Sequence, residues 1–470
     1  MRDAATATMT PERPNLVREE FHDVPFLPEK AHLAEFENGH QLVFVPKRGE
    51  VFNLNTWVTT GSIHENNDNN GVSHFLEHLM FKGTERFQPG EFDKAMESMG
   101  AIINAATWRD FTFYYVTGPN HNNGGNFLKA LDMHADMLLA STLPEREIGP
   151  QYNPDDPNYA GEKRERSVVI EEIAMRDDQP WTKVFNAIND MMYADGHPYQ
   201  RDVIGTRQII GNIARASIEH YYKSWYGPKS MMTIVVGDFD WHQLQLDVAK
   251  AFKFGAAHEK HPGEPIWQAD QLPAAITKRP EVGAPSILHA DVQTGFVMLG
   301  FHGPSPTDLK ASIGLDVISY VLGESRSSRL HQNLVEKASP RVFNSIGCGQ
   351  NTQRLGNVFH INGNFSGSNY NAALGQIHEE LSAFISKAPI SMDEFTRAKK
   401  NLRAGFAETS ETASGIAETI GESYTILGSL NGYIGYLDAL DKLTLEDVMA
   451  LAAKYLKPEA AYTAVLMPKG

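Results

Sequence analysis

The chain has 470 residues, of which 41% are hydrophobic and 21% are charged. This composition is typical of a globular protein, and the length allows two or more domains with cores of their own. With 58 acidic and 42 basic residues, the net charge is −16. This charge argues against nucleic acid as the main partner, because phosphate binding needs clustered Lys and Arg. It favours neutral or basic ligands.

The only cysteine, Cys348, excludes an intrachain disulfide framework and a cysteine-based zinc site. We expect it to be a small buried hydrophobic residue. No apolar run approaches the roughly 18 to 20 residues that span a bilayer, so membrane insertion is not expected. The polar N-terminus lacks the apolar stretch of a signal peptide. The sequence therefore leaves the compartment open: periplasm if a signal peptide was removed, otherwise cytoplasm.

In chain order, residues 1–25 are expected to be a flexible lead. Alternating apolar and polar residues predict strands in QLVFVPK and VFNLNTWVTTG, followed by a helix from Val72 to Phe81. Two further strands are predicted in GAIINAAT and DFTFYYVTG, and a helix from Phe127 to Ala140. The stretch PEREIGPQYNPDDPNYAGEK predicts a loop or insertion, and GEKRERSVVIEEIAMRDD predicts a strong helix.

A second break lies at residues 255–285, where five prolines predict a linker between two halves. Segments 223–238 and 453–468 align without a gap, so that Pro228 matches Pro458 and Thr233 matches Thr463. Each segment combines the end of a helix with an apolar strand. The repeat predicts two homologous α+β halves, 26–254 and 286–470, with mixed, mostly antiparallel sheets flanked by helices.

The segment VSHFLEHLMFKGT contains His74, Glu77 and His78 in the order H-x-x-E-H. Residues four apart share a helix face, so both imidazoles can reach one metal ion while Glu77 approaches a metal-bound water. A catalytic zinc site needs a third protein ligand and an open position. Without such a ligand, two partly exposed histidines on an amphipathic helix would explain the pattern.

Candidates for the third ligand lie in RERSVVIEEIAMR, where Glu165 and Glu172 are seven residues apart and share a helix face. The apolar residues between them indicate a helix packed into a core, where a carboxylate needs a partner. Glu171 points about 100° away from Glu172. A solvated charged stripe is the alternative interpretation.

Together, HFLEHLMFKGT and ERSVVIEEIAMRDD resemble the pitrilysin/insulysin family of inverted zinc metallopeptidases, which includes the mitochondrial processing peptidase. The resemblance implies that His74, His78 and Glu172 bind one Zn²⁺ per chain. It implies a second-sphere role for Glu165, which would orient His74 or His78. The spacing between the two motifs is longer than usual in the family, and an insertion around residues 147–161 accounts for the excess.

The implied activity is endopeptidase cleavage of oligopeptides or unfolded segments inside a chamber, with this chain forming one half of a clamshell. Zinc would activate water, and Glu77 would act as the general base. GAIINAATWRDFTFYY resembles the family's substrate-binding edge strand, which implies that Ile103, Asn104 and Ala105 pair with a peptide backbone. An ordinary strand with a bend at Asn104 is the alternative.

The second half has no H-x-x-E-H motif, and its equivalent helix is expected near SIGLDVISYVLG. SSRLHQNLVEKASPRVFNSIG resembles the family segment that supplies an Arg and a Tyr to the substrate. Here the Arg position holds Val335, and the Tyr position holds Val342 or Phe343. The resemblance therefore implies a partner, a homologous subunit that lacks the zinc motif and supplies both side chains. A non-catalytic scaffold subunit and a presequence-processing peptidase are the alternative functions.

Overall fold

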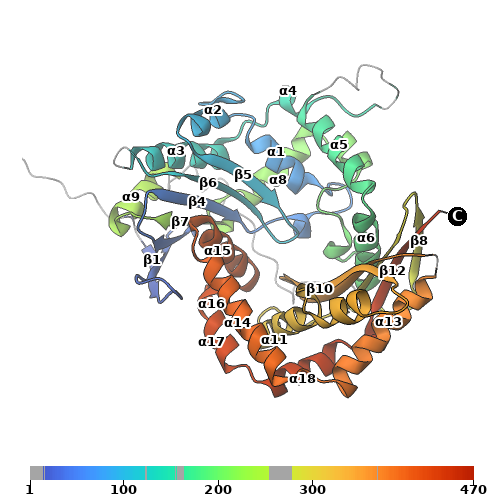
Figure 1. Ribbon diagram of the computed structural model, residues 1–470. Coiled ribbons are helices and arrows are strands. Elements are labelled where there is room, and N and C mark those ends of the chain that lie inside the picture. Colours follow the sequence, from blue (N-terminus) through green and yellow to red (C-terminus); the bar gives the residue numbers. More distant parts are fainter. Residues whose placement is uncertain are drawn as a thin grey trace, which may run out of the picture.

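The computed structural model describes residues 14, 16–121, 124–153, 155, 163–252, 278–367 and 369–469. These residues form two halves, each a mixed β-sheet flanked by helices (Figure 1). The fold class predicted from the sequence is confirmed. Most of the expected linker, residues 255–285, lies outside the described residues, as do residues 156–161 of the expected insertion. Among the described helices, none combines the length and the apolar character needed to cross a membrane.

The first half contains a seven-stranded sheet in the order β1-β2-β3-β7-β4-β6-β5. All neighbours are antiparallel except β3 and β7. The strands are β1 (Leu16–His22), β2 (Ala31–Phe36), β3 (Gln41–Pro46), β4 (Val51–Val58), β5 (Ile102–Thr107), β6 (Thr112–Pro119) and β7 (Met231–Gly237). Because β1 pairs with β2 along its length, the expectation of a flexible lead is wrong for residues 16–22.

Helices cover both faces of this sheet, and α1 ends one residue before the predicted limit. The α-helices are α1 (Val72–Met80), α2 (Glu91–Ser98), α3 (Gly125–Ala140), α4 (Glu145–Ile148), α5 (Glu165–Asp177), α6 (Pro180–Met192), α7 (Arg207–Asn212), α8 (Arg215–Trp225) and α9 (Trp241–Ala251). Short 3₁₀ turns are η1 (Ser62–His64), η3 (Pro198–Gln200) and η4 (Pro228–Ser230).

The second half contains a five-stranded sheet in the order β10-β11-β9-β12-β8. The strands are β8 (Ser286–Ala290), β9 (Gly295–His302), β10 (Phe343–Gln353), β11 (Gly356–Phe365) and β12 (Tyr462–Pro468). The α-helices are α11 (Leu309–Ser319), α12 (Arg329–His331), α13 (Tyr370–Ser382), α14 (Met392–Thr409), α15 (Ala413–Leu427), α16 (Asn431–Ile434), α17 (Tyr436–Lys442) and α18 (Leu445–Tyr455). Single turns are η6 (Tyr320–Glu324), η7 (Gln332–Glu336), η8 (Ala383–Lys387) and η9 (Pro458–Ala460).

The two sheets share one topology. Taken from its other edge, the second sheet runs β8-β12-β9-β11-β10, which corresponds strand by strand to β3-β7-β4-β6-β5. The single parallel pair also occupies the same place, β8 with β12 and β3 with β7. Helix α11 follows β9 as α1 follows β4, where the sequence placed the equivalent of the zinc helix. This correspondence supports the predicted duplication.

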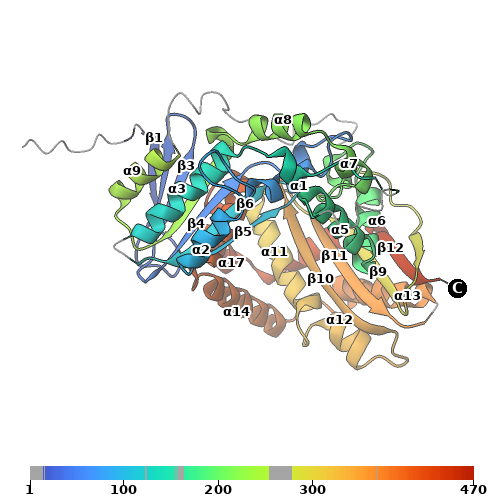
Figure 2. The same cartoon turned by 90° about the horizontal axis from the view of Figure 1, so that it is seen from above.

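Each half also contributes a helix to the core of the other. Helix α6 packs against β9 and β12 of the second sheet, and α15 packs against β4 and β7 of the first. Figure 1 shows α15 beneath the first sheet and α6 beside β12, and Figure 2 shows α6 again beside β12 from above. The proposed domain limits, 26–254 and 286–470, therefore separate the two repeats in the sequence, but they do not separate the hydrophobic cores, which share helices.

The β5–β6 turn of the first half contacts the corresponding β10–β11 turn of the second. Asp110 Oδ1 accepts a hydrogen bond from Tyr199 Oη at 2.6 Å, and Asp110 Oδ2 accepts one from Arg354 N at 3.0 Å. The Arg354 guanidinium returns a bond to the carbonyl of Asp110 at 2.9 Å. All three side chains are buried, so this junction holds the edge strand β5 in a defined position relative to the second half.

Candidate metal centre

Helix α1 begins at a buried carboxylate. Glu65 accepts hydrogen bonds from the backbone N–H groups of Gly71 at 2.7 Å and Ser73 at 2.8 Å, which are among the donors left unpaired at a helix start. Gly71 adopts φ +92°, a left-handed conformation that favours glycine. Phe75 and Leu79 then anchor one face of α1 in the core, so the opposite face presents the polar residues of the motif.

The structure brings His74, His78 and Glu172 together. Glu172 Oε2 lies 3.7 Å from Nε2 of each histidine, and one ligand atom from each residue lies within 4.8 Å of the others. In a tetrahedral zinc site with bonds of about 2.0–2.1 Å, neighbouring ligand atoms are about 3.3 Å apart. The two distances to Glu172 therefore exceed this spacing by only about 0.4 Å. The donor set, two imidazoles and a carboxylate, fits zinc.

Glu165 lies beside His78, not His74. His78 Nδ1 is 3.0 Å from Glu165 Oε2, and Lys82 Nζ is 2.7 Å from Glu165 Oε1. Burial by itself would raise the pKa of Glu165. The hydrogen bonds from His78 and Lys82 outweigh this effect and hold the pKa below its usual value. If Nδ1 of His78 carries the proton, Nε2 presents its lone pair toward Glu172. Lys82, which sequence reasoning missed, is four residues after His78 and could have been found by helical spacing.

His74 is held neutral by its surroundings. Burial, the neighbouring His78 and the guanidinium of Arg176 lower the pKa of His74 to about 3. Its Nδ1 is buried without a hydrogen-bond partner among the described residues. A neutral imidazole is the form that binds a metal, and its Nε2 already faces Glu172.

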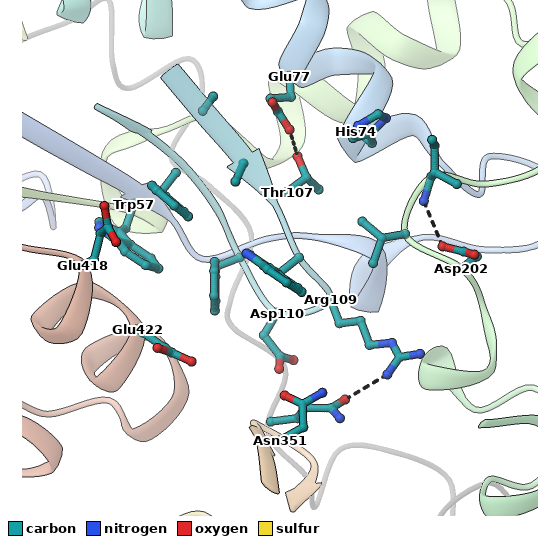
Figure 3. Close-up of a pocket in the computed structure, with 18 of the residues that line it drawn as sticks. Trp57, His74, Glu77, Thr107, Arg109, Asp110, Asp202, Asn351, Glu418 and Glu422 are labelled. Atoms are coloured by element: carbon teal, nitrogen blue, oxygen red, sulfur yellow. Dashed lines mark hydrogen bonds between the residues drawn. The ribbon is translucent and has the colours of Figure 1, made fainter. Parts of the chain in front are cut away.

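Glu77 faces the neighbouring edge strand. Its Oε2 accepts a hydrogen bond of 2.6 Å from Thr107 Oγ1 at the end of β5 (Figure 3). Burial raises the pKa of Glu77 above its usual value. Glu77 is not part of the group formed by His74, His78 and Glu172. Sequence reasoning missed Thr107, because only the folded register places it opposite α1.

Among the described strands, β5 pairs with β6 alone and therefore lies at an open edge of the first sheet. Trp108 N donates to Phe111 O at 2.8 Å in the following turn, and antiparallel pairs alternate between hydrogen-bonded and unbonded. Counting back along the register, the backbone groups of Ile103 and Ala105 point away from β6. The backbone of Asn104 faces β6, and its side-chain oxygen accepts a bond of 2.9 Å from Ala105 N.

A cavity of about 540 Å³ lies beside these residues and extends toward the second half. Figure 3 shows His74 and Glu77 at one end, with Glu418 and Glu422 of α15 across from Arg109 and Asp202. The lining residues come from both halves: Trp57, His74, Glu77, Ala105, Ala106, Thr107, Trp108, Arg109, Asp110, Phe111, Phe113, Arg176, Phe185, Asp202, Val203, Ile204, Asn351, Thr352, Gln353, Glu418 and Glu422.

The positions that the family resemblance assigns to Arg and Tyr are occupied by apolar core residues. Val335 and Phe343 belong to the hydrophobic core of the second half, and Val342 packs against it. Arg341 donates from Nε to the carbonyl oxygen of Phe343 at 3.0 Å. Cys348 is buried in the same core, as expected. The described second half therefore offers no side-chain hydrogen-bond donor from these two positions.

Comparison with known proteins agrees with this architecture. The family model "Insulinase (Peptidase family M16)" matches residues 47–207, and "Peptidase M16 inactive domain" matches residues 212–402. The zinc protease PqqE of Helicobacter pylori is 28% identical over 459 residues, covering 95% of each chain. The uncharacterized zinc protease YmxG of Bacillus subtilis is 26% identical over 419 residues, covering 89% of this chain and 93% of that protein.

The fold of the chain also matches that of a solved relative. The crystal structure of a protease from Helicobacter pylori has a TM-score of 0.80 and 26% identity, covering 94% of this chain and all of that one (100%). Two alike halves, with two imidazoles and a carboxylate converging beside an open sheet edge, define the architecture of an inverted metallopeptidase. The chain belongs to peptidase family M16, the pitrilysin/insulinase family.

Proposed function

We propose that this chain is a zinc-dependent endopeptidase that binds one Zn²⁺ through His74, His78 and Glu172. The observation that carries the proposal is the distance of 3.7 Å from Glu172 Oε2 to Nε2 of both histidines, next to a cavity that Glu77 also lines. The names of the relatives, zinc proteases, support the same metal and reaction class.

A bound zinc ion supplies Lewis acidity, which acidifies a water molecule and polarises a carbonyl oxygen. Glu77 takes the proton of the attacking water and delivers it to the amine leaving group. Thr107 holds the Glu77 carboxylate at the end of β5 through its bond of 2.6 Å. Glu165 orients the imidazole of His78 from the side away from the metal.

Peptide substrates bind along the open edge of β5. The amide and carbonyl groups of Ile103 and Ala105 point away from β6 and can form main-chain hydrogen bonds with an extended peptide. The side chain of Asn104, now bonded to Ala105 N, must release that amide on binding. Such pairing recognises oligopeptides and unfolded segments and leaves the side-chain preference to the cavity.

The substitution Glu77→Gln tests the assignment directly. The variant should keep about one zinc per chain and lose peptide cleavage by about 10²–10⁴-fold, the usual contribution of a general base. Glu172→Gln should instead lower zinc occupancy, measured by metal analysis. Glu171→Gln, an exposed neighbour on α5, is the matched control and should change neither. Substantial turnover by zinc-replete Glu77→Gln protein would refute the role of Glu77. Wild-type protein that binds no zinc, and cleaves no peptide even when mixed with a homologous partner chain, would favour a scaffold subunit.

The chain is proposed to work with a homologous subunit. Val335 occupies the position where the family resemblance places an Arg, and Val342 or Phe343 the position of a Tyr. Val335 and Phe343 are buried in the second core, and Val342 packs against it. Stabilising the oxyanion often lowers the barrier of such a reaction more than any other single effect, so these donors must come from elsewhere. A related chain without the zinc motif, facing the cavity, would supply them and close the clamshell.

A further inference from the structure

Arg109, in the turn after β5, is a buried cation without a counter-ion in the described part of the chain. Only 8% of the residue is exposed, and it lines the same cavity as His74 and Glu77. No described carboxylate lies within the 4.0 Å that defines an ion pair. Its one hydrogen bond between side chains, from Nη1 to Gln353 Oε1, is long at 3.5 Å. Burying a charge without a partner costs free energy unless a ligand completes the site.

The guanidinium is nevertheless held in a defined place. Its carbon lies 5.2 Å from the centre of the Phe185 ring and 5.6 Å from that of Tyr199, distances at which cation–π attraction operates. The adjacent carboxylate of Asp110 does not serve as counter-ion, because it accepts its bonds from Tyr199 and from the backbone of Arg354. The aromatic residues and Asp110 therefore position Arg109 without neutralising it.

The other charged groups of the cavity differ from Arg109. Arg176, the second cation, has an ion pair with Asp202 at 3.4 Å. Glu418 and Glu422 lie on α15, across the cavity from Arg109 (Figure 3). The side of the cavity formed by β5 and α6 thus carries a cation free to accept an anion. A planar guanidinium matches a carboxylate through two parallel hydrogen bonds.

The position of Arg109 connects it to the reaction. Arg109 follows Thr107, the partner of Glu77, by two residues, so their Cα atoms are at most about 7 Å apart. A peptide paired with β5 therefore passes this guanidinium within a few residues of its scissile bond. Resting on the proposed peptidase function, we propose that Arg109 forms a carboxylate subsite, which binds an acidic side chain or the C-terminal carboxylate of the substrate.

The test measures binding and not turnover, so that it does not depend on activity. Fluorescent peptides are titrated by anisotropy into zinc-loaded Glu77→Gln protein. One series changes Glu to Gln at a single position around the scissile bond, and a second compares a C-terminal carboxylate with its amide. One of these carboxylates should strengthen binding about tenfold, equivalent to about 1.4 kcal/mol. The series in which the effect appears identifies the source of the carboxylate.

In the Glu77→Gln background, adding Arg109→Gln should reduce the preference to less than about twofold, and Arg109→Lys should keep part of it. Arg176→Gln removes the same charge from the same cavity and should leave the preference intact. Zinc content and thermal melting check that each variant is folded.

Three outcomes would overturn the subsite. In the first, no carboxylate strengthens peptide binding. In the second, Arg109→Gln weakens the binding of acidic and neutral peptides equally, and in the third, Arg176→Gln reduces the carboxylate preference as much as Arg109→Gln does. The second outcome would make Arg109 a structural residue, and the third would reduce the effect to general electrostatics. Absence of cleavage by the wild-type protein mixed with its homologous partner chain would refute the peptidase proposal instead and leave a measured carboxylate preference standing.

Discussion

Single residues around the metal centre differ in how directly they act. Glu165 touches the proposed site only through His78, at 3.0 Å, and is itself bonded to Lys82 at 2.7 Å. Partners of this kind orient a ligand imidazole, and their loss typically costs 10–100-fold in metal affinity. The side chain of Glu165 is 11% exposed, so water cannot simply replace it. We therefore expect Glu165 to contribute by orienting a ligand and not by contacting the substrate.

We expect Glu165→Gln to weaken zinc binding by about 10–100-fold, because the amide keeps the shape but loses the charge that pairs with His78 and Lys82. A competition titration against a chromogenic chelator measures the affinity. Lys82→Met should have a smaller effect, since Lys82 contacts only Glu165 among these groups. Glu171→Gln on the same helix is the control. Unchanged zinc affinity in Glu165→Gln would show that His78 needs no such partner.

At the scale of elements, the sequence predicted the positions of candidate site residues well where one helix contains both the buried apolar residues and the candidate metal-binding residues. In α1 the apolar residues Phe75 and Leu79 define the buried face, so the positions of His74 and His78 follow from helical periodicity. Thr107 and Arg109 could not be placed in the same way. Their surroundings depend on how β5 and its turn pack against α1, α6 and the second half, and this information is not local.

Helix α11, the counterpart of α1, carries a partly buried carboxylate, that of Asp316, instead of histidines. Asp316 accepts hydrogen bonds from Gln350 and from Tyr436 Oη, the latter at 3.2 Å. Burial nevertheless raises the pKa of Asp316 to about 7. Since the folded state then holds the proton more tightly than the unfolded state, the protonated acid is the stabilised form. Stability is lost as the pH rises from about 4 through about 7, by on the order of 4 kcal/mol.

Asp316→Asn should remove this dependence, because the amide cannot ionise. Relative to wild type, the variant should gain several kcal/mol of unfolding free energy between pH 5 and pH 8. Urea unfolding at both pH values measures the difference. Asp438→Asn, at an exposed carboxylate of α17 paired with Lys442, is the control. Its unfolding free energy should change with pH in the same way as that of wild type. The same parallel behaviour in Asp316→Asn would show that Asp316 is ionised in the folded protein without cost.

For the molecule as a whole, the sequence repeat at 223–238 and 453–468 predicted the shared topology but not the exchange of helices between halves. The aligned segments become α8 with β7 and α18 with β12, which are equivalent in both sheets. Helices α6 and α15 instead cross to the opposite sheet. Their apolar faces predict burial but do not identify the partner. This exchange joins the two halves, so both shape one cavity between them.

The residues around that cavity also predict how well the isolated chain should bind zinc and cleave peptides. The first half holds His74, His78 and Glu172. In the second half, Val335 and either Val342 or Phe343 stand at the Arg and Tyr positions, and their side chains cannot donate a hydrogen bond. We therefore expect the purified chain to bind zinc but to cleave peptides poorly. Mixing with a homologous chain that lacks H-x-x-E-H but carries the Arg and Tyr should raise kcat/KM by about 10²–10³-fold, the size of one lost oxyanion donor. The same mixture made with Glu77→Gln chain should stay inactive, which assigns the activity to this zinc site. Full activity of the chain alone would contradict the need for a partner.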